Sequence, residues 1–150
     1  MMVQGKWISP GSDLSVLIPV REAVFGRGQD RLDEISWNVL VCQDSFPAAT
    51  GRIWWQDGAF WLGDLCVLEQ YRRRRLGDLV LRLLLYKAQE HAAREVRLLC
   101  PPEVSGFFSR LGLREQVSDH PFLTEMMIPG SEIDLDTCKN CPASSCSRRK

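Results

Sequence analysis

Apolar residues recur along the chain in runs whose length and period separate strands from helices. The segment 78–94 is rich in apolar residues, contains neither Pro nor Gly, and is long enough for a helix of more than four turns. It follows an apolar run of strand length, residues 60–68, and precedes the short β-forming stretch 95–100. A strand, a helix and a strand in this order predict a parallel pair joined by a right-handed crossover.

The segments on either side of this unit are shorter and predict a mainly antiparallel arrangement. In chain order they are a helix over 12–25, a polar connector over 29–34, strands over 35–42 and 48–55, a short helix over 103–111, and a closing hairpin of strands over 113–118 and 122–128. The pair Asp57-Gly58 is a hairpin signal. The pattern therefore predicts an α/β protein with a mixed sheet flanked by helices.

The first helix has two candidate N-caps, Ser12 and Ser15. With Ser15 as the cap, Pro19 falls in the first turn, where its missing N–H costs little. Gly26 and Gly28 then end the element.

Composition predicts one globular domain, residues 1–130, followed by a cysteine-rich tail, residues 131–150. Of 150 residues, 45% are apolar and 25% are charged, and 19 basic residues balance 19 acidic ones. A neutral chain is not expected to bind nucleic acid or a membrane surface. The N-terminus lacks the apolar core of a signal peptide and no stretch is apolar enough to span a bilayer, so we expect a cytoplasmic protein.

Four consecutive arginines, Arg72 to Arg75, stand between the 60–68 strand and the long helix. A helix N-terminus presents unpaired N–H groups and the positive end of the helix dipole, and arginine adds forked donors that fit phosphate. The stretch therefore predicts a phosphate site for a small anionic ligand. A solvated turn of arginines is the alternative, and a charge run by itself favours that alternative.

Two strings of this sequence resemble the motifs of the GNAT superfamily of N-acyltransferases. Residues 65–77, LCVLEQYRRRRLG, are similar to that family's strand followed by Arg/Gln-x-x-Gly-x-Gly/Ala, with Arg72 and Gly77 at the outer fixed positions and Arg75 in place of the middle glycine. Residues 107–113, FFSRLGL, are similar to its Phe-Tyr-x-x-x-Gly-Phe string. A third and weaker likeness is residues 20–25 ahead of an acidic connector. The resemblance covers roughly residues 14–128 and implies a GNAT-like sheet of six to seven strands.

The resemblance implies that the protein binds acetyl-CoA or another acyl-CoA and transfers the acyl group to an amine, on a small molecule or on a protein. The backbone of Leu65 and Val67 would pair with the pantetheine arm where the fourth and fifth strands separate. Backbone N–H groups from Arg73 to Asp78 would hold the pyrophosphate, and at Arg75 we expect either a right-handed helical conformation or a narrowed loop. The implied cofactor-binding residues are Leu65, Val67, Arg72, Arg73, Arg74, Arg75, Leu76, Gly77, Asp78 and Phe108.

The catalytic groups are not evident in the sequence. Phe108 replaces the tyrosine that often protonates the thiolate in this family, and Trp61 matches the position of a strand-four glutamate base. Asp64 differs from Trp61 in strand parity, so we expect it to face away from that site. Weak candidates remain in Asp33, Glu34 and His120, each of which is more often a structural or solvated residue.

Cysteines raise two further questions. Cys66 would permit a covalent mechanism, but its strand setting favours a buried and inert thiol. In the tail, the spacing of Cys138, Cys141 and Cys146 suggests zinc or an iron–sulfur cluster, and the alternative is a polar tail of reduced cysteines. A fourth ligand would come from His91, His120, Cys42, Cys100 or the second chain of a homodimer; the sequence leaves the oligomeric state open.

Three functions are thus compatible with the sequence. The first is an acyl-CoA-dependent N-acyltransferase. The second is a non-catalytic acyl-CoA-binding or regulatory module, which the replacements at Trp61, Arg75 and Phe108 would suit. The third is a metal- or redox-sensing protein in which the cysteine tail acts on the fold.

Overall fold

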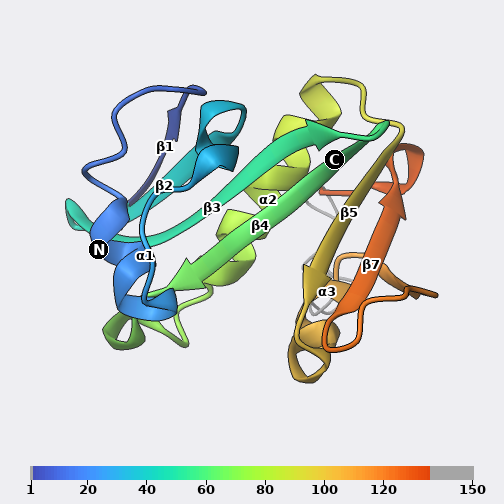
Figure 1. Cartoon of the computed structure of the whole chain (residues 1–150). Coiled ribbons are helices and arrows are strands. Elements are labelled where there is room, and N and C mark those ends of the chain that lie inside the picture. Colours follow the sequence, from blue (N-terminus) through green and yellow to red (C-terminus); the bar gives the residue numbers. More distant parts are fainter. Residues whose placement is uncertain (1, 136–150) are drawn as a thin grey trace, which may run out of the picture.

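A computed structural model describes residues 2–135 of the chain. Seven strands form one sheet in the order β1-β2-β3-β4-β5-β7-β6 (Figure 1). Every neighbouring pair is antiparallel except β4 and β5, which are parallel. The strands are β1 (Val3–Ile8), β2 (Trp37–Gln43), β3 (Phe46–Gln56), β4 (Ala59–Val67), β5 (Glu95–Cys100), β6 (Arg114–Gln116) and β7 (Thr124–Pro129). The predicted mixed sheet with one parallel crossover is confirmed.

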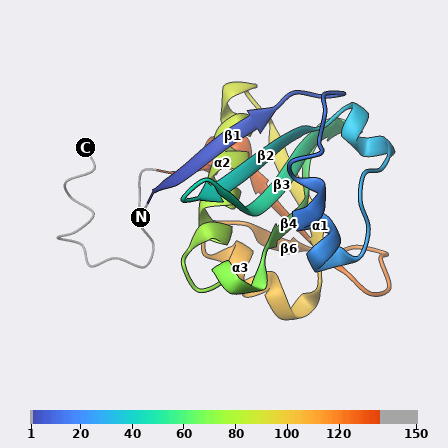
Figure 2. The same ribbon diagram turned by 90° about the vertical axis from the view of Figure 1, so that its left-hand side faces the viewer.

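Within residues 2–135 the strands are accompanied by three α-helices and four short 3-10 turns. They are α1 (Ile18–Phe25), α2 (Leu76–Glu90), α3 (Ser105–Ser109), η1 (Arg31–Glu34), η2 (Glu69–Tyr71), η3 (Pro102–Val104) and η4 (Gly130–Glu132). Helices α1 and α2 lie on opposite faces of the sheet, as the two perpendicular views show (Figures 1 and 2).

The main core lies between α2 and the sheet. The buried side chains of α2 form one stripe at helical spacing: Leu76, Val80, Leu81, Leu84, Leu85 and Ala88. Gly51 on β3 lets the helix approach closely, because a Cβ at this position would lie 2.8 Å from the Val80 Cγ1 atom. A smaller cluster of Ile8, Leu14, Leu17 and Leu40 forms a second core on its own.

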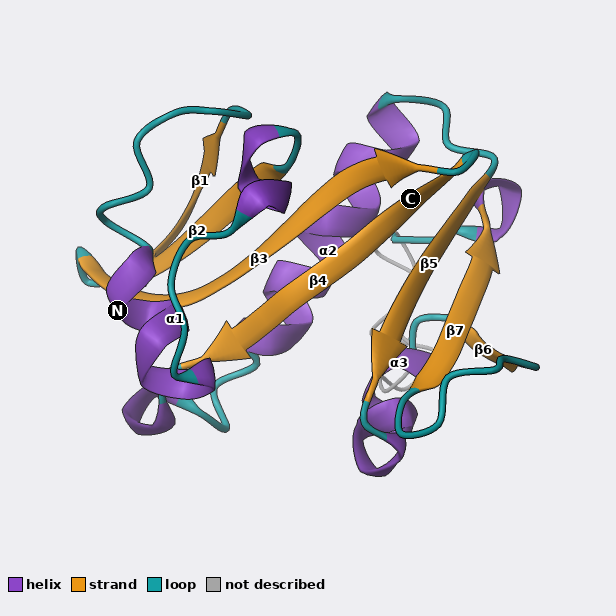
Figure 3. Ribbon diagram, viewed as in Figure 1, coloured by secondary structure: helices purple, strands orange, loops and turns teal. Residues whose placement is uncertain are grey.

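Strands β4 and β5 pair only over Phe60 to Leu62 on β4 and then separate, as Figure 3 shows. At the point of separation β4 carries a bulge, because Gly51 on β3 lies opposite two residues, Asp64 and Leu65. Asp64 has φ +51°, in the left-handed region. The bulge changes the direction of the side chains that follow it and re-aims Asp64.

Several expectations about the first helix were wrong. It begins at Ile18 rather than near Ser12, its N-cap Leu17 makes no side-chain cap bond, and the Ser15 hydroxyl bonds to Asp13 instead. Pro19 lies in the first turn of this helix, where its missing N–H costs little, as the sequence predicted for a start near Pro19.

The other boundaries agree closely or differ for local reasons. Strand β5 matches residues 95–100, whereas α2 ends at Glu90 because Ala92 takes φ +53°. The helix expected over 103–111 is divided between η3 and α3. Strand β1 was not expected; it pairs with β2 along its whole length, and Trp7 packs edge-on against Trp37.

Residues 131–135, assigned to the tail from the sequence, contact α2. Ile133 is buried in the main core, and its carbonyl accepts a hydrogen bond from Gln89 at 3.0 Å. None of the helices within residues 2–135 combines the length and apolar character needed to cross a bilayer.

Candidate functional site

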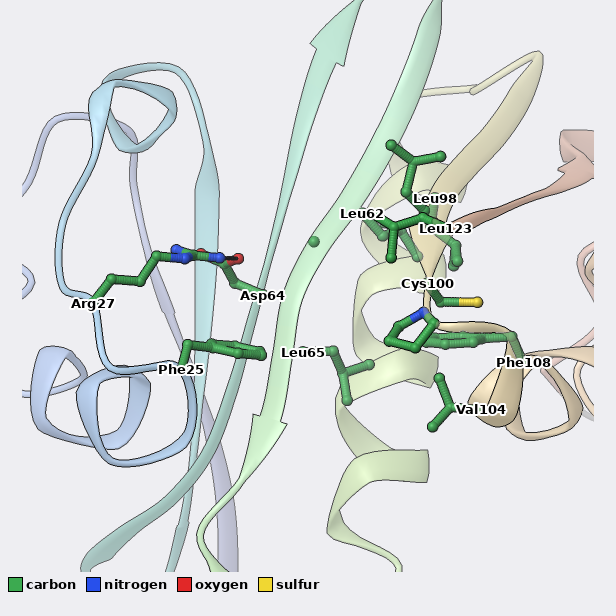
Figure 4. A pocket seen from close by; sticks show the side chains of 13 residues that line it. Phe25, Arg27, Leu62, Asp64, Leu65, Leu98, Cys100, Val104, Phe108 and Leu123 are labelled. Atoms are coloured by element: carbon green, nitrogen blue, oxygen red, sulfur yellow. Dashed lines mark hydrogen bonds and ion pairs between the residues drawn. The ribbon is translucent and has the colours of Figure 1, made fainter. Parts of the chain in front are cut away.

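A cavity of about 290 Å³ occupies the gap where β4 and β5 separate (Figure 4). Most of its lining is apolar: Leu62, Leu65, Leu98, Leu99, Cys100, Val104, Phe108 and Leu123. Arg27 and Asp64 are its charged lining residues, and Phe25 lies beside them. In Figure 4 this polar pair lies on one side of β4 and the β5 and α3 residues lie across the gap.

Two further hollows continue this cavity toward the N-terminus of α2. One of about 410 Å³ shares Leu65, Val104 and Phe108 with the first, and the other, of about 300 Å³, shares Val67 and Gly77 with the second. The three hollows therefore form one groove, which runs from the strand gap to the start of the long helix.

The far end of the groove brings together the uncapped start of α2 and several arginines. The first intrahelical bond of α2 runs from the Leu79 N–H to the Arg75 carbonyl, so the N–H groups of residues 76–78 precede it, and no side chain caps the helix. Four arginines line this hollow: Arg72, Arg73, Arg75 and Arg110. The one carboxylate there, on Asp78, is paired with Arg82 at 2.8 Å.

The groove brings together nearly all residues that the resemblance implied for cofactor binding. Leu65, Val67, Gly77 and Phe108 line it together with the N-terminal turn of α2. Arg74 lines none of the three hollows, and its guanidinium lies 5.8 Å from the centre of the Tyr71 ring.

Arg75 does not adopt the right-handed conformation that we considered. It has φ +62° and ψ +21°, and Arg73 has φ +66°. Left-handed conformations cost a residue with a side chain roughly 1–2 kcal/mol. Arg75 thus takes the backbone angle for which glycine is favoured, and its side chain remains among the hollow's lining.

The other end of the groove abuts a partly buried ion cluster, defined here as Arg21, Arg27, Arg52, Asp30, Asp33 and Asp64, of which Arg27 and Asp30 are exposed. Arg21 donates to Asp33 at 2.8 and 3.2 Å, and Arg52 contacts Asp30, Asp33 and Asp64 at 2.6 to 3.2 Å. Three carboxylates and three guanidinium groups balance, as the burial of ionic side chains requires.

Asp64 lies on the same face of the sheet as Trp61, so the expectation from strand parity was wrong. Asp64 pairs with Arg52 at 3.2 Å, Arg52 lies over the Trp54 ring, and Trp54 is the cross-strand partner of Trp61. The cause is the bulge, because it breaks the alternation of side chains along β4. A Cβ at Gly63 would point toward the Trp54 ring, and Asp64, at positive φ, points to this same face of the sheet.

Known proteins resemble the chain mainly in structure. No family model matches the sequence. The uncharacterized protein YyaT of Bacillus subtilis is 26% identical over 131 residues, which cover 80% of this chain and 87% of that protein.

Solved structures give closer agreement. An acyl-CoA N-acyltransferase from Pseudomonas aeruginosa has a TM-score of 0.75 at 16% identity, covering 84% of this chain and 99% of that one. The ribosomal-protein-S18-alanine N-acetyltransferase from Escherichia coli gives 0.71 at 15% identity, covering 94% and 99%. The PaiA N-acetyltransferase from Thermoplasma acidophilum, solved with coenzyme A, gives 0.68 at 16% identity, covering 86% and 99%. The chain has the GNAT acyltransferase fold.

In this GNAT fold the three weak catalytic candidates lie away from the groove's lining. Asp33 is buried in the ion cluster; burial alone would raise its pKa, but hydrogen bonds from Arg21 and the Asp30 N–H, with the nearby guanidinium charges, hold the pKa below its ordinary value. Glu34 is exposed on η1. His120 is exposed, and its Nδ1 atom accepts from the N–H groups of Phe122 and Leu123.

Phe108 and Trp61 occupy the positions at which the resemblance implied an acid and a base. Phe108 is almost fully buried and packs edge-on against Phe107, with ring centres 5.0 Å apart. The Trp61 indole N–H donates to the Gln56 carbonyl at 3.2 Å. Neither side chain offers a group that can exchange a proton with a substrate.

The buried cysteines are unsuited to nucleophilic work. Burial raises the pKa of the Cys66 thiol to about 12, and the charge of Asp64 adds to this effect. Burial also raises the pKa of Cys100, which lines the strand gap. Both cysteines therefore remain protonated near neutral pH.

Residues 2–135 contain no group of three or more His, Cys, Asp or Glu side chains arranged to hold a metal ion. The metal ligands suggested by the sequence, Cys138, Cys141 and Cys146, lie outside the described residues.

Proposed function

We propose that this protein is an acyl-CoA-dependent N-acyltransferase that uses acetyl-CoA as its donor and an amine as its acceptor. The observation that carries the proposal is the groove that joins an anion-binding helix N-terminus to a gap between two separated strands. An acyl-CoA has the matching order of groups, with phosphates at one end, an amide-bearing arm, and a thioester at the other end.

The phosphate end of the donor fits the hollow at α2. The N–H groups of Leu76, Gly77 and Asp78 and four arginines of this hollow supply donors and positive charge. The Arg72 side chain is held in place by its hydrogen bond to the Val67 carbonyl at 3.0 Å.

The amide-bearing arm fits the free edge of β4. Beyond Leu62, β4 has no pairing with β5, so its backbone groups from Gly63 onward are available on that side. Such an edge binds an amide chain as if it were an added strand.

Acyl-CoA supplies a thioester whose acyl carbon accepts the lone pair of the amine while the carbon–sulfur bond breaks and the leaving thiolate takes up the proton that the amine loses. The carboxylate at the gap, Asp64, has its oxygens engaged by three guanidinium groups, so it is not free to contact the reactive amine. We therefore assign the rate enhancement mainly to positioning of an amine that arrives neutral.

Calorimetric titration of acetyl-CoA, free CoA and acetyl-pantetheine tests the donor site. We expect saturable, salt-sensitive binding of the two nucleotides and much weaker binding of acetyl-pantetheine, which lacks the phosphates. Equal binding of all three would contradict the phosphate assignment.

Single-turnover transfer to a panel of amines then separates an enzyme from the rival, a non-catalytic acyl-CoA-binding module. Binding without transfer to any amine would favour the rival, which the side chains of Phe108 and Trp61 already suit.

A separate hypothesis concerns the cysteines at 138, 141 and 146, whose spacing suggests that they bind one zinc ion or iron–sulfur cluster per chain or per dimer. Elemental analysis of protein purified without chelator tests it, and a metal-free protein with three titratable thiols in this segment would contradict it.

A further inference from the structure

The carboxylate of Asp64 is held by three guanidinium groups that differ in exposure. Arg21 Nε lies 3.3 Å away and an Arg52 terminal nitrogen 3.2 Å away, and these two side chains are 0% and 4% exposed. The third, Arg27, donates to both carboxylate oxygens, one of them at 3.0 Å, and its side chain is 48% exposed. Asp64 therefore has two buried counter-ions and one that is open to solvent.

The departure of Arg27 would change the charge of the cavity wall. The three carboxylates and three guanidinium groups of the ion cluster cancel while Arg27 is in place. Without it, the cluster carries one excess negative charge, at a carboxylate that lines the strand gap. A carboxylate whose side chain is only 6% exposed is strongly stabilised by a replacement cation.

The local chain allows Arg27 to move. It lies between Gly26, which ends α1 at φ +73°, and Gly28, on the connection to η1. Two other partners are close by: the Asp30 carboxylate at 3.9 Å and the Phe25 ring, whose centre is 5.1 Å from the guanidinium carbon. Arg27 can thus leave Asp64 without losing all of its favourable contacts.

We propose that Asp64 binds a cationic group of the acceptor in the place that Arg27 occupies in the free protein, so that the acceptor is an amine with a second positive charge. This inference rests on the proposed function and names its substrate class. The second charge pairs with Asp64 on one side of β4, and the methylene chain reaches across to the apolar gap, where the reactive amine meets the thioester (Figure 4). No other carboxylate lines that cavity among the described residues.

The first test is a calorimetric titration of three probes with the same five-carbon chain. They are 1,5-diaminopentane, whose two ends are cationic, 1,5-pentanediol, whose ends are neutral, and pentanedioate, whose ends are anionic. We expect the diamine to bind at least about tenfold more tightly than either of the others, because it gains a charge-assisted hydrogen bond to Asp64. Equal binding of the diamine and the diol overturns the proposal, and so does tightest binding of pentanedioate, which would make Arg27 the ligand-binding residue.

Variants at Arg27 and Asp64, with a control at Arg31, test whether diamine binding depends on these two residues. Arg27→Gln removes the competing guanidinium and is expected to tighten diamine binding at least threefold, whereas Arg31→Gln, an exposed arginine on the adjacent η1 turn, leaves it unchanged. Asp64→Asn is expected to abolish the preference for the diamine. Where Asp64→Asn fails to fold, the Arg27→Gln result decides alone, and unchanged diamine affinity in that variant overturns the proposal.

These titrations require no acyl donor, so they separate this inference from the proposed function. Diamine binding that depends on Asp64 in a protein that does not bind acetyl-CoA would support the cation site and contradict the acyltransferase proposal. Acyl transfer with no preference for the diamine would support the acyltransferase proposal and contradict the cation site.

Discussion

The Arg21 guanidinium donates two hydrogen bonds to the Asp33 carboxylate, at 2.8 and 3.2 Å, and both side chains are shielded from solvent. This pair joins α1 to η1, and Asn38 on β2 also accepts a hydrogen bond from Arg21 at 2.9 Å. The same contacts hold the connection between α1 and η1, which carries Arg27, a lining residue of the strand gap. Asp33 is thus a structural residue, in agreement with the more frequent role of such a carboxylate.

Asp33→Asn should lower the free energy of unfolding by about 3–5 kcal/mol at pH 7, because it removes the carboxylate that pairs with both Arg21 and Arg52 and leaves the ion cluster with one uncompensated positive charge. The measurement is urea unfolding followed by circular dichroism. Glu34→Gln, on the same turn but exposed, is the matched control and should change stability by no more than about 0.5 kcal/mol.

Acid titration gives an independent test of the same pair. The pKa of Asp33 is lower in the folded protein than its ordinary value of 3.8, so the unfolded chain binds more protons at low pH. The stabilisation is fully present above the ordinary pKa and is lost as the pH falls through the lowered folded pKa. The Asp33→Asn variant should show a shallower loss of stability in this range, and an unchanged slope would refute the assignment.

Gly77→Asp should weaken acetyl-CoA binding at least about tenfold by placing a carboxylate at the start of α2, where an anion is expected. Steric cost is small, because a Cβ at Gly77 would lie 3.5 Å from its nearest neighbours on Phe107 and Val67. Gly77→Asn has the same size without the charge and is the control. Calorimetry measures the acetyl-CoA affinity of both folded variants. Equal affinities of Gly77→Asp and Gly77→Asn would contradict the assignment of the pyrophosphate to this site.

Arg75→Gly and Arg75→Ala should differ in stability although both remove the guanidinium. Arg75 has φ +62°, which glycine adopts freely and alanine does not. We expect the glycine variant to be more stable than the alanine variant by about 1 kcal/mol. Thermal or urea unfolding measures the difference, and an alanine variant of equal or greater stability would show that the left-handed angle is not strained.

Phe108→Tyr should leave the fold intact and raise the rate of acyl transfer, because the new hydroxyl can protonate the departing thiolate. Phe108 lines both the strand gap and the adjoining hollow, so a hydroxyl there has room. The readout is single-turnover rate together with CoA affinity. A slower reaction at unchanged CoA affinity would mean that Phe108 does more than occupy the place of a missing acid.

The fold was predictable from the sequence wherever periodicity was strong. Strand β5 and the parallel crossover through α2 follow from uninterrupted apolar patterns. Strand β1 was missed because Gly5 and Lys6 interrupt its pattern, and its stability comes from pairing with β2 and from the contact of Trp7 with Trp37.

The two ends of the candidate site were predictable to different degrees. The end at α2 is local in sequence, so the grouping of residues 72–78 around the helix start could be predicted from the arginine run, with the exception of Arg74. Their role in binding phosphate stays a prediction. The ion cluster is not local, because Arg21, Arg52 and Asp64 come from α1, β3 and β4. A bulge cannot be read from alternation, and the orientation of Asp64 was therefore assigned wrongly.

The short ladder between β4 and β5 also bears on how the chain avoids aggregation. Strand edges that lack a partner are templates for pairing with other molecules, and proteins usually blunt or cover them. Here two such edges face one another inside the sheet, closed at one end by the pairs from Phe60 to Leu62 and flanked by Phe108 and Leu123. The protein thereby keeps unpaired backbone available for a slender ligand while presenting little of it to a neighbouring chain.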